Sequence, residues 1–216
     1  MPIITVAQQK GGAGKTTLVA HLAIALAQRG LTAATVDIDP QASLSHWYAA
    51  REEALGEDAT GLTHRQISGW RTQREVEELA NEYDVVIVDS APHAEMETKN
   101  AIRSASLVVV PVQPSPMDLW ATKPTLELAA GEKVTPMLVL NRVPPRANLA
   151  DLIERKLKAL KVKVARSQLG NRVGLAAAMM DGRTISETQR RSVGAAEVKK
   201  LAAEIYKAAG GQKKLR

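Results

Sequence analysis

The chain has 216 residues, of which 45% are hydrophobic and 24% are charged, and its formal net charge is +6. This length suits a single domain over residues 1–216, and its apolar runs are too short to cross a membrane. The lack of cysteine excludes disulfides and thiolate chemistry, and the N-terminus has no signal-peptide pattern, so we expect a cytoplasmic globular protein.

Short apolar runs alternate with helix-like stretches along the chain. The runs are continuous in Val, Ile and Leu, which is typical of strands covered on both faces. The expected strands are Ile3–Ala7, Ala33–Ile38, Val85–Val88, Leu107–Val112 and Met137–Leu140, with Val162–Ala165 as a candidate sixth. The expected helices are Thr16–Arg29, Gln73–Asn81, Glu95–Arg103, Leu119–Ala130, Leu149–Leu160 and Glu187–Ala209, and Glu52–Gly69 is expected to be a loop with a short helix. The alternation predicts an α/β fold with a doubly wound, mostly parallel sheet flanked by helices.

The strongest chemical signal lies between the first expected strand and the first expected helix. Residues 9–17 read QKGGAGKTT and end in the Gly-Lys-Thr of a phosphate-binding loop. Glycines let successive backbone N–H groups converge on phosphate oxygens, and the helix that follows adds its positive end to the same site. We expect Lys15 to reach the β- and γ-phosphates and the Thr16 hydroxyl to ligate Mg²⁺. The predicted nucleotide-binding residues of the loop are Gly11, Gly12, Ala13, Gly14, Lys15, Thr16 and Thr17.

The loop departs from the general motif at its start, because Gln9 occupies the first glycine position and a second lysine, Lys10, follows it. In this respect the sequence resembles the ParA/MinD family of deviant Walker A ATPases, whose loop reads Lys-Gly-Gly-x-Gly-Lys-Thr. The resemblance implies an ATPase that uses ATP and Mg²⁺, and a sandwich dimer in which Lys10 crosses to the phosphates of the partner subunit. The resemblance spans nearly the whole chain and is densest in residues 1–120. In its compact length the chain is similar to the small ParA (ParF-like) proteins.

Three aspartates follow expected strands. Asp37 and Asp39 are two residues apart at a strand end, so they point the same way, toward the carboxyl edge where α/β sheets bind ligands. Asp89 ends the third expected strand and resembles a Walker B aspartate. The resemblance assigns Asp37 to the Mg²⁺ water shell and Asp39 to the attacking water, and Asp89 would reach Mg²⁺ through water. Together with Lys10 and Lys15, Asp39 completes the predicted catalytic set.

Asn141 follows the fifth expected strand, at the family position where an asparagine amide reads adenine. An amide can pair with both the ring nitrogen and the amino group of adenine, and the sequence has no Asn/Thr-Lys-x-Asp signature for guanine, so adenine is favoured. The alternative is that Asn141 is a helix cap or turn residue. Pro111–Asp118 also looks like the family and is expected to form a loop near the nucleotide and the dimer interface.

Charge is distributed unevenly along the chain. Residues 1–140 contain 11 basic and 17 acidic residues, whereas residues 141–216 contain 18 basic and 6 acidic residues. The basic C-terminal third (141–216) indicates a polyanionic partner, and the alternative is a solvated basic surface. The candidate DNA-contacting residues are Arg166, Arg172, Arg190, Arg191, Lys199 and Lys200.

The function that the resemblance implies is positioning. We expect an ATP-bound homodimer that binds DNA non-specifically on the nucleoid, and a cargo-bound partner protein that stimulates an otherwise weak hydrolysis. The cargo would be a plasmid or chromosome, or a protein cluster such as chemoreceptors or carboxysomes. One alternative is a MinD-like membrane-associated ATPase, although residues 197–216 have few of the large apolar residues that an interfacial anchor needs. The other is an ATP-dependent metabolic synthetase of the same superfamily, which would need additional substrate domains.

Overall fold

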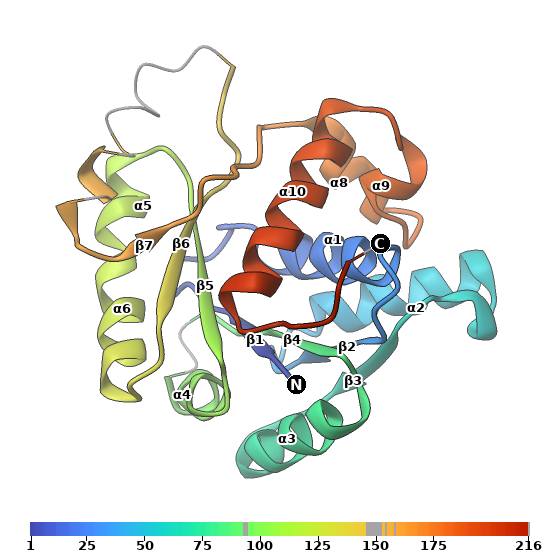
Figure 1. Cartoon of the computed structure of the whole chain (residues 1–216), viewed down its shortest axis with the longest axis horizontal. Coiled ribbons are helices and arrows are strands. Elements are labelled where there is room, and N and C mark those ends of the chain that lie inside the picture. The colour runs from blue at the N-terminus through green and yellow to red at the C-terminus, as the bar shows by residue number, and fades with distance from the viewer. Residues whose placement is uncertain (93–94, 146–152, 154, 158, 216) are drawn as a thin grey trace.

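Seven parallel strands form the central sheet of the computed structural model, which describes residues 1–92, 95–145, 153, 155–157 and 159–215 (Figure 1). The strand order is β3-β2-β4-β1-β5-β6-β7, and each adjacent pair is parallel. The strands are β1 (Ile3–Val6), β2 (Ala33–Asp37), β3 (Thr63–Gln66), β4 (Val85–Asp89), β5 (Leu107–Val112), β6 (Pro136–Leu140) and β7 (Lys163–Val164). The prediction of an α/β fold with a doubly wound, mostly parallel sheet is confirmed.

Helices cover both faces of the sheet. Side chains of α1, α2, α8, α9 and α10 pack on one face, and side chains of α3, α4 and α6 pack on the other (Figure 1). The helices are α1 (Lys15–Ala27), α2 (Ser43–Leu55), α3 (Thr72–Glu82), α4 (Glu95–Arg103), α5 (Pro116–Trp120), α6 (Thr122–Gly131), α8 (Val173–Met179), α9 (Ile185–Thr188) and α10 (Val193–Ala208). Within the described ranges, each helix is too short or too polar to span a bilayer.

The strands read as continuous apolar runs because both of their faces are buried. In β4, Val85 and Ile87 pack with the α1 face, whereas Val86 and Val88 pack with the α3 face, and all four have no exposed surface. Helix α1 is also enclosed, with ten buried residues among its thirteen, since it lies between the sheet and α10. The phosphate loop therefore joins two of the most buried elements of the fold.

Several expectations need correction, among them the loop expected at Pro111–Asp118, whose first residues belong to β5 and whose last belong to α5. Residues 43–55 form α2, which we did not predict, and β3 occupies part of Glu52–Gly69, which we expected to be a loop with a short helix. The expected helix Glu187–Ala209 is two helices, because Ser192 accepts a hydrogen bond from the Ala195 amide and starts α10 there. The expected helix Leu149–Leu160 lies partly outside the described residues; of those described, 153, 155–157 and 159 are helical and Leu160 is in a turn.

Candidate nucleotide-binding site

The phosphate loop connects β1 to α1 and has the backbone that an anion-binding turn requires. Gly12 and Gly14 have φ angles of +74° and +88°, which residues with a Cβ rarely adopt. A Cβ on Gly14 would also lie 2.7 Å from Nδ2 of Asn141, so this position has room for glycine alone. Lys15 begins α1 and is 7% exposed, and its Nζ donates to the carbonyl of Gln8 over 3.1 Å. The loop thus presents its backbone and a buried lysine to one site at a helix N-terminus.

The carboxylate of Asp89 lies directly beside this loop. Thr16 Oγ1 donates to Asp89 Oδ2 over 2.6 Å, while the buried Oδ1 makes no hydrogen bond within the described residues. Burial raises the pKa of Asp89 to about 7, against the opposing hydrogen bond from Thr16. Burial also lowers the pKa of Lys15, and the Asp89 charge opposes that shift. The oxygen Oδ1 of Asp89, unpaired within the described residues, and the hydroxyl of Thr16 are both oxygen ligands of the kind that Mg²⁺ prefers. The two residues therefore fit the Mg²⁺ that the resemblance implies.

Asp37 is fully buried and is paired in register with Asp89 across β2 and β4. Its Oδ1 accepts a hydrogen bond from the amide of Asp39 over 3.0 Å, and its Oδ2 accepts from the amide and the hydroxyl of Ser45 over 2.9 and 3.0 Å. Asp37 therefore folds the loop that carries Asp39 and fixes the start of α2. Asp39 is half-buried, and its carboxylate accepts from the Gln41 amide over 2.9 Å. The structure brings all three predicted aspartates to the edge of the sheet next to the loop.

Two cavities flank the phosphate loop. The first has a volume of about 590 Å³ and the second about 460 Å³, which is the size range of small-molecule sites. The first is bounded by the loop, Asp39, α2 and α8, and the second by the loop, Asn141 and the start of α8. The residues that α2, α8 and the end of α8 contribute to the first cavity were missed in the sequence analysis: Ser43, His46, Trp47, Ala50, Ala176, Met179 and the C-cap Met180.

The comparisons with known proteins show which family the chain belongs to. Residues 4–185 match the CobQ/CobB/MinD/ParA nucleotide binding domain. The chain belongs to this family. It is 32% identical to the chromosome-partitioning ATPase Soj of Thermus thermophilus, over 94% of each chain. It is 28% identical to the maintenance of carboxysome distribution protein A of Halothiobacillus neapolitanus, over 90% of this chain and 91% of that one.

Among solved structures, the fold is similar to that of the septum site-determining protein MinD of Pyrococcus horikoshii complexed with Mg-ADP. The TM-score is 0.78 and the identity is 21%, with 99% of each chain covered. The resemblance to the ParA/MinD family that the loop sequence predicted is therefore confirmed, and the chain is a P-loop NTPase of ParA/MinD type.

Asn141, the predicted reader of adenine, is tied into the loop of this ParA/MinD-type site. It is 5% exposed, its Nδ2 donates to the Ala13 carbonyl over 2.9 Å, and its Oδ1 accepts from the Arg142 amide over 3.0 Å. These bonds fasten the end of β6 to the phosphate loop. Each amide atom keeps one further hydrogen-bonding position, so base reading stays a prediction beside this structural role.

Lys10, which the resemblance identifies as the signature lysine, is half-buried and forms an ion pair within its own chain. Its Nζ lies 2.6 Å from Oδ2 of Asp118, on α5. Lys10 and Lys15 thus have different partners: Lys10 has a carboxylate outside the loop, and Lys15 has the backbone carbonyl of Gln8, directly before the loop.

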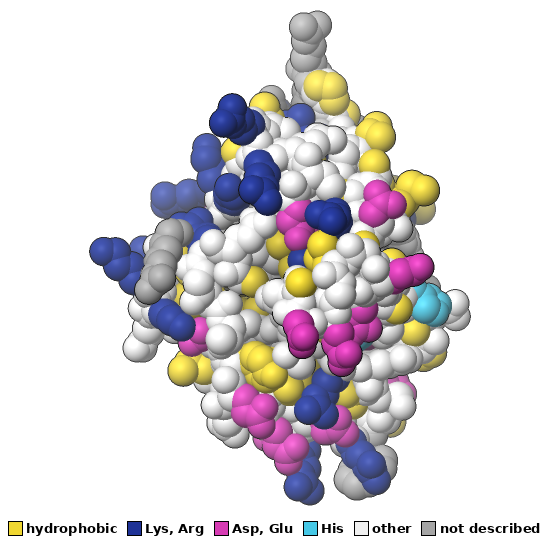
Figure 2. Space-filling model, turned by 90° about the vertical axis from the view of Figure 1, so that its right-hand side faces the viewer, with side chains coloured by type: hydrophobic (Ala, Val, Ile, Leu, Met, Phe, Trp, Pro, Cys, Tyr) yellow, Lys and Arg dark blue, Asp and Glu magenta, His cyan; other side chains and the backbone are white. Residues whose placement is uncertain are grey.

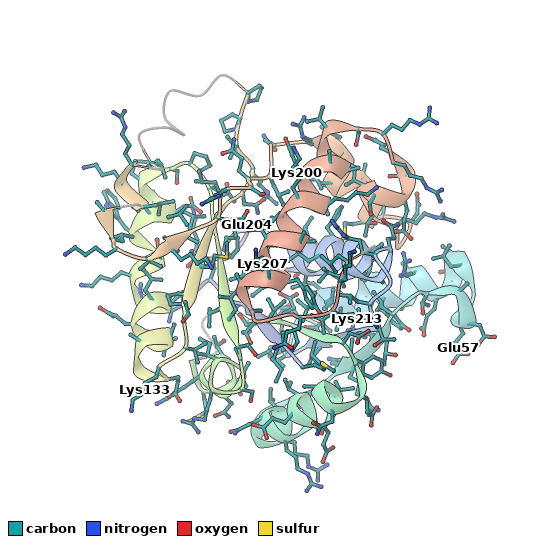
Figure 3. All side chains as sticks on the ribbon, viewed as in Figure 1. Glu57, Lys133, Lys200, Glu204, Lys207 and Lys213 are labelled. Atoms are coloured by element: carbon teal, nitrogen blue, oxygen red, sulfur yellow. The ribbon has the colours of Figure 1, made fainter. Side chains whose placement is uncertain are left out.

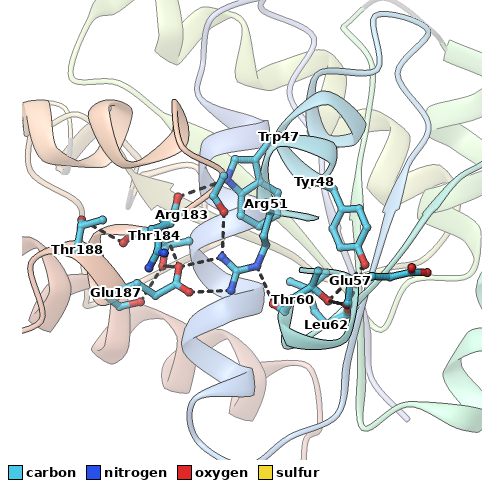
Figure 4. A network of polar contacts seen from close by, with 12 residues as sticks. Trp47, Tyr48, Arg51, Glu57, Thr60, Leu62, Arg183, Thr184, Glu187 and Thr188 are labelled. Atoms are coloured by element: carbon cyan, nitrogen blue, oxygen red, sulfur yellow. Dashed lines mark hydrogen bonds and ion pairs between the residues drawn. The ribbon is translucent and has the colours of Figure 1, made fainter. Parts of the chain in front are cut away.

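A buried ion pair joins α2 to α9, as Figure 4 shows. The Arg51 guanidinium donates to both carboxylate oxygens of Glu187, over 3.1 and 2.7 Å, and to the carbonyls of Gly182 and Thr60 over 2.9 and 2.6 Å. Burial alone would raise the pKa of Glu187, but the hydrogen bonds from Arg51 and Thr184 outweigh it and hold this pKa below its usual value. The segment before α9 is therefore fixed against the helix that follows Asp39.

Two side chains near the nucleotide site hold the same segment. His21 bonds through Nδ1 to the Thr17 carbonyl over 2.8 Å, and its Nε2 accepts from the Ile185 amide over 3.2 Å. Trp47, which lines the first cavity, donates from Nε1 to the Arg183 carbonyl over 3.3 Å (Figure 4). These bonds tie the start of α9 to both α1 and α2.

The predicted DNA-contacting residues fall into two groups. Arg166, Arg190, Arg191, Lys199 and Lys200 are exposed, and the last two lie on α10, where Figure 3 shows Lys200 and Lys207 along the same helix. Arg172 is different, because its guanidinium forms a two-bond ion pair with Glu197, with Nε and Oε2 2.8 Å apart. Its role as a DNA contact stays a prediction, although in the structure its charge is already paired with Glu197.

Proposed function

We propose that this chain is a Mg²⁺-dependent ATPase of ParA type that dimerises with ATP, binds DNA without sequence preference and positions a cargo. The observation that carries the proposal is the pair of loop lysines, because Lys15 is buried at the start of α1 whereas Lys10 is half-buried and paired with Asp118 outside the loop. A lysine outside its own site suits a role in a second subunit, since a cation given in trans neutralises phosphate charge only when two subunits meet. The whole-length similarity to Soj and to the carboxysome distribution protein supports positioning over metabolism.

In this proposal, each part of the site has one task. The loop backbone and Lys15 bind and orient the phosphates, and Asp39 orients the attacking water. Mg²⁺, held by Thr16 directly and by Asp37 and Asp89 through water, would neutralise phosphate charge. Hydrolysis stays weak until a cargo-bound partner stimulates it, which makes the lifetime of the dimer depend on meeting the cargo.

Light scattering with ATP or ADP tests the assembly. ATP should give a dimer and ADP a monomer, because only the γ-phosphate offers Lys10 a partner across the interface. Asp39→Ala should bind ATP, fail to hydrolyse it and remain dimeric, whereas Lys15→Ala should lose productive binding. A monomeric Asp39→Ala protein saturated with ATP would contradict the mechanism.

The surface of α10 supports DNA as the polyanion. Its acidic residues Glu197 and Glu204 are partly buried and accept hydrogen bonds from backbone amides: Glu197 from Gly170, and Glu204 from Arg166 and Ser167. The lysines of α10 therefore stand outward with their acidic neighbours already engaged. Figure 2 shows Lys and Arg gathered at the upper left of one face, while most acidic side chains lie across its middle and lower part. Such separation suits a surface that contacts phosphates without reading bases.

DNA retention at several salt concentrations tests this surface. Binding should require ATP, be alike on unrelated sequences, and fall with salt at a log–log slope of about -0.9 per phosphate contact. Arg190→Ala/Arg191→Ala should weaken binding and flatten the slope while the ATP dimer persists. The matched control is Arg65→Ala/Arg74→Ala, which removes two exposed arginines of β3 and α3. ATP-dependent flotation with anionic liposomes, without DNA retention, would favour the membrane alternative.

A further inference from the structure

The lysine proposed to act in a partner subunit is engaged within its own. Lys10 Nζ lies 2.6 Å from Asp118 Oδ2, and the exposed fractions of the two side chains are 38% and 2%. The two residues are 108 positions apart in the sequence, so the contact depends on the fold that brings α5 over the phosphate loop. The pair joins the loop to the segment 111–118, which we expected near the dimer interface.

The carboxylate of Asp118 is held in place on α5. Ser115 caps this helix by accepting from the Asp118 amide over 3.1 Å, and its hydroxyl donates to the same carboxylate oxygen that Lys10 contacts. Thr122 Oγ1 donates to the Asp118 carbonyl over 3.1 Å. The other carboxylate oxygen, Oδ1, is buried and has no hydrogen bond within the described residues.

Lys10 is the one cationic side chain paired with Asp118 in the described part of the chain. A buried carboxylate that loses its counter-charge carries an unfavourable desolvation energy. Any state in which Lys10 leaves therefore has an energy cost on Asp118, whereas a state in which Lys10 stays does not. In the proposed function, Lys10 therefore has two alternative positions: paired with Asp118 in its own subunit, or at the phosphates of the other subunit.

We propose that Asp118 is a positioning residue that holds Lys10 within the single chain and thereby opposes formation of the ATP-bound dimer. The proposal rests on the proposed function, in which Lys10 moves to the phosphates of the partner subunit. Because both subunits must release a lysine, the ion pair acts twice in each dimer. It lowers the fraction of chains ready to dimerise, and so it raises the apparent dissociation constant of the dimer.

The first test is the dimer dissociation constant of Asp118→Asn, measured by sedimentation with saturating ATP in the Asp39→Ala background to prevent hydrolysis. Asparagine keeps the shape of the side chain but removes its charge, so the constant should fall by about tenfold or more, as two weak ion pairs would give. In the Lys10→Ala background, where the proposed function expects little or no dimer, Asp118→Asn should not restore dimerisation, since no lysine is then left to release. Unchanged or weaker dimerisation in Asp118→Asn would overturn the proposal.

The matched control is Asp84→Asn. Asp84 forms a similar ion pair with Lys213, with Nζ and Oδ2 also 2.6 Å apart, and neither residue lies in the nucleotide site. The dimer constant of this variant should match that of the parent. A similar gain in Asp84→Asn would mean that a general change of charge, and not the release of Lys10, causes the effect.

The second test needs no dimer. In the nucleotide-free protein, acetylation of Lys10 by an N-hydroxysuccinimide ester, followed by mass spectrometry, should be several-fold faster in Asp118→Asn than in the wild type. Equal rates would overturn the claim that Asp118 holds Lys10.

Failure of this proposal can be told apart from failure of the proposed function. If neither the wild type nor any variant dimerises with ATP, the proposed function fails. The acetylation rates then decide by themselves whether Asp118 holds the lysine. If melting curves find Asp118→Asn unfolded, Asp118→Ser, which also removes the charge, should change both readouts in the same direction.

Discussion

Removal of the Arg51 guanidinium should destabilise the fold more than removal of an exposed arginine. The side chains of Arg51 and Glu187 are 4% and 13% exposed, and the guanidinium also serves two backbone carbonyls. Arg51→Met would leave a half-buried carboxylate without its cation and two carbonyl groups without a donor. The loss of one partner from a buried ion pair costs about 3–5 kcal/mol. For a chain of this length, the melting temperature should therefore fall by roughly 6–20 °C.

Urea unfolding followed by circular dichroism measures this loss. The control is Arg74→Met, because Arg74 and Glu78 form an ion pair of the same length, 2.7 Å, with side chains 82% and 56% exposed. The control should change stability by at most about 0.5 kcal/mol. Replacement of both Arg51 and Glu187 by Met should recover much of the loss, because no uncompensated charge remains. The reasoning is wrong if Arg51→Met and Arg74→Met cost the same.

Three other changes test backbone strain and burial. Ala42 has a φ of +52° at the start of α2, so Ala42→Gly should raise the free energy of unfolding by about 1 kcal/mol, measured with urea. A Cβ on Gly182, which has a φ of +62°, would lie 2.1 Å from the Arg51 backbone nitrogen, so Gly182→Ala should lower that free energy by roughly 2–5 kcal/mol. Burial lowers the pKa of His21 from 6.5 to about 4, so the unfolded chain binds a proton there that the folded chain does not. Stability should fall as pH drops from about 6.5 toward 4, by up to roughly 1.4 kcal/mol per pH unit, and His21→Gln should flatten that part of the profile.

The inner strands were predictable because complete burial leaves a continuous apolar signature. The edge strand β3 reads Thr-His-Arg-Gln and is only partly covered, so it lacks that signature. Helix α2 buries only Leu44, Trp47 and Arg51, and the last of these is charged, so no apolar stripe marks its inner face. The residues 189–192 read as a continuation of a helix, but the backbone leaves the helical region at Gln189 and the Ser192 cap starts α10 anew.

The phosphate loop was predictable because its chemistry lies in nine consecutive residues. The partners of its side chains were not, since they come from remote positions that the fold brings close. The contact of Lys10 with Asp118 is an example, although the family-like segment 111–118 pointed to the right region. Arg172 is another, because its engagement by Glu197 depends on how α10 packs against the preceding loop.

The burial of α1 has a consequence for local opening of the protein. Its amides are enclosed between the sheet and α10, so their exchange with deuterated solvent should require opening of a large part of the fold. Gly11 and Gly12, a few residues before, are exposed and should exchange rapidly. The phosphate loop and the helix that follows it should therefore differ strongly in exchange rate, although they are adjacent in the sequence.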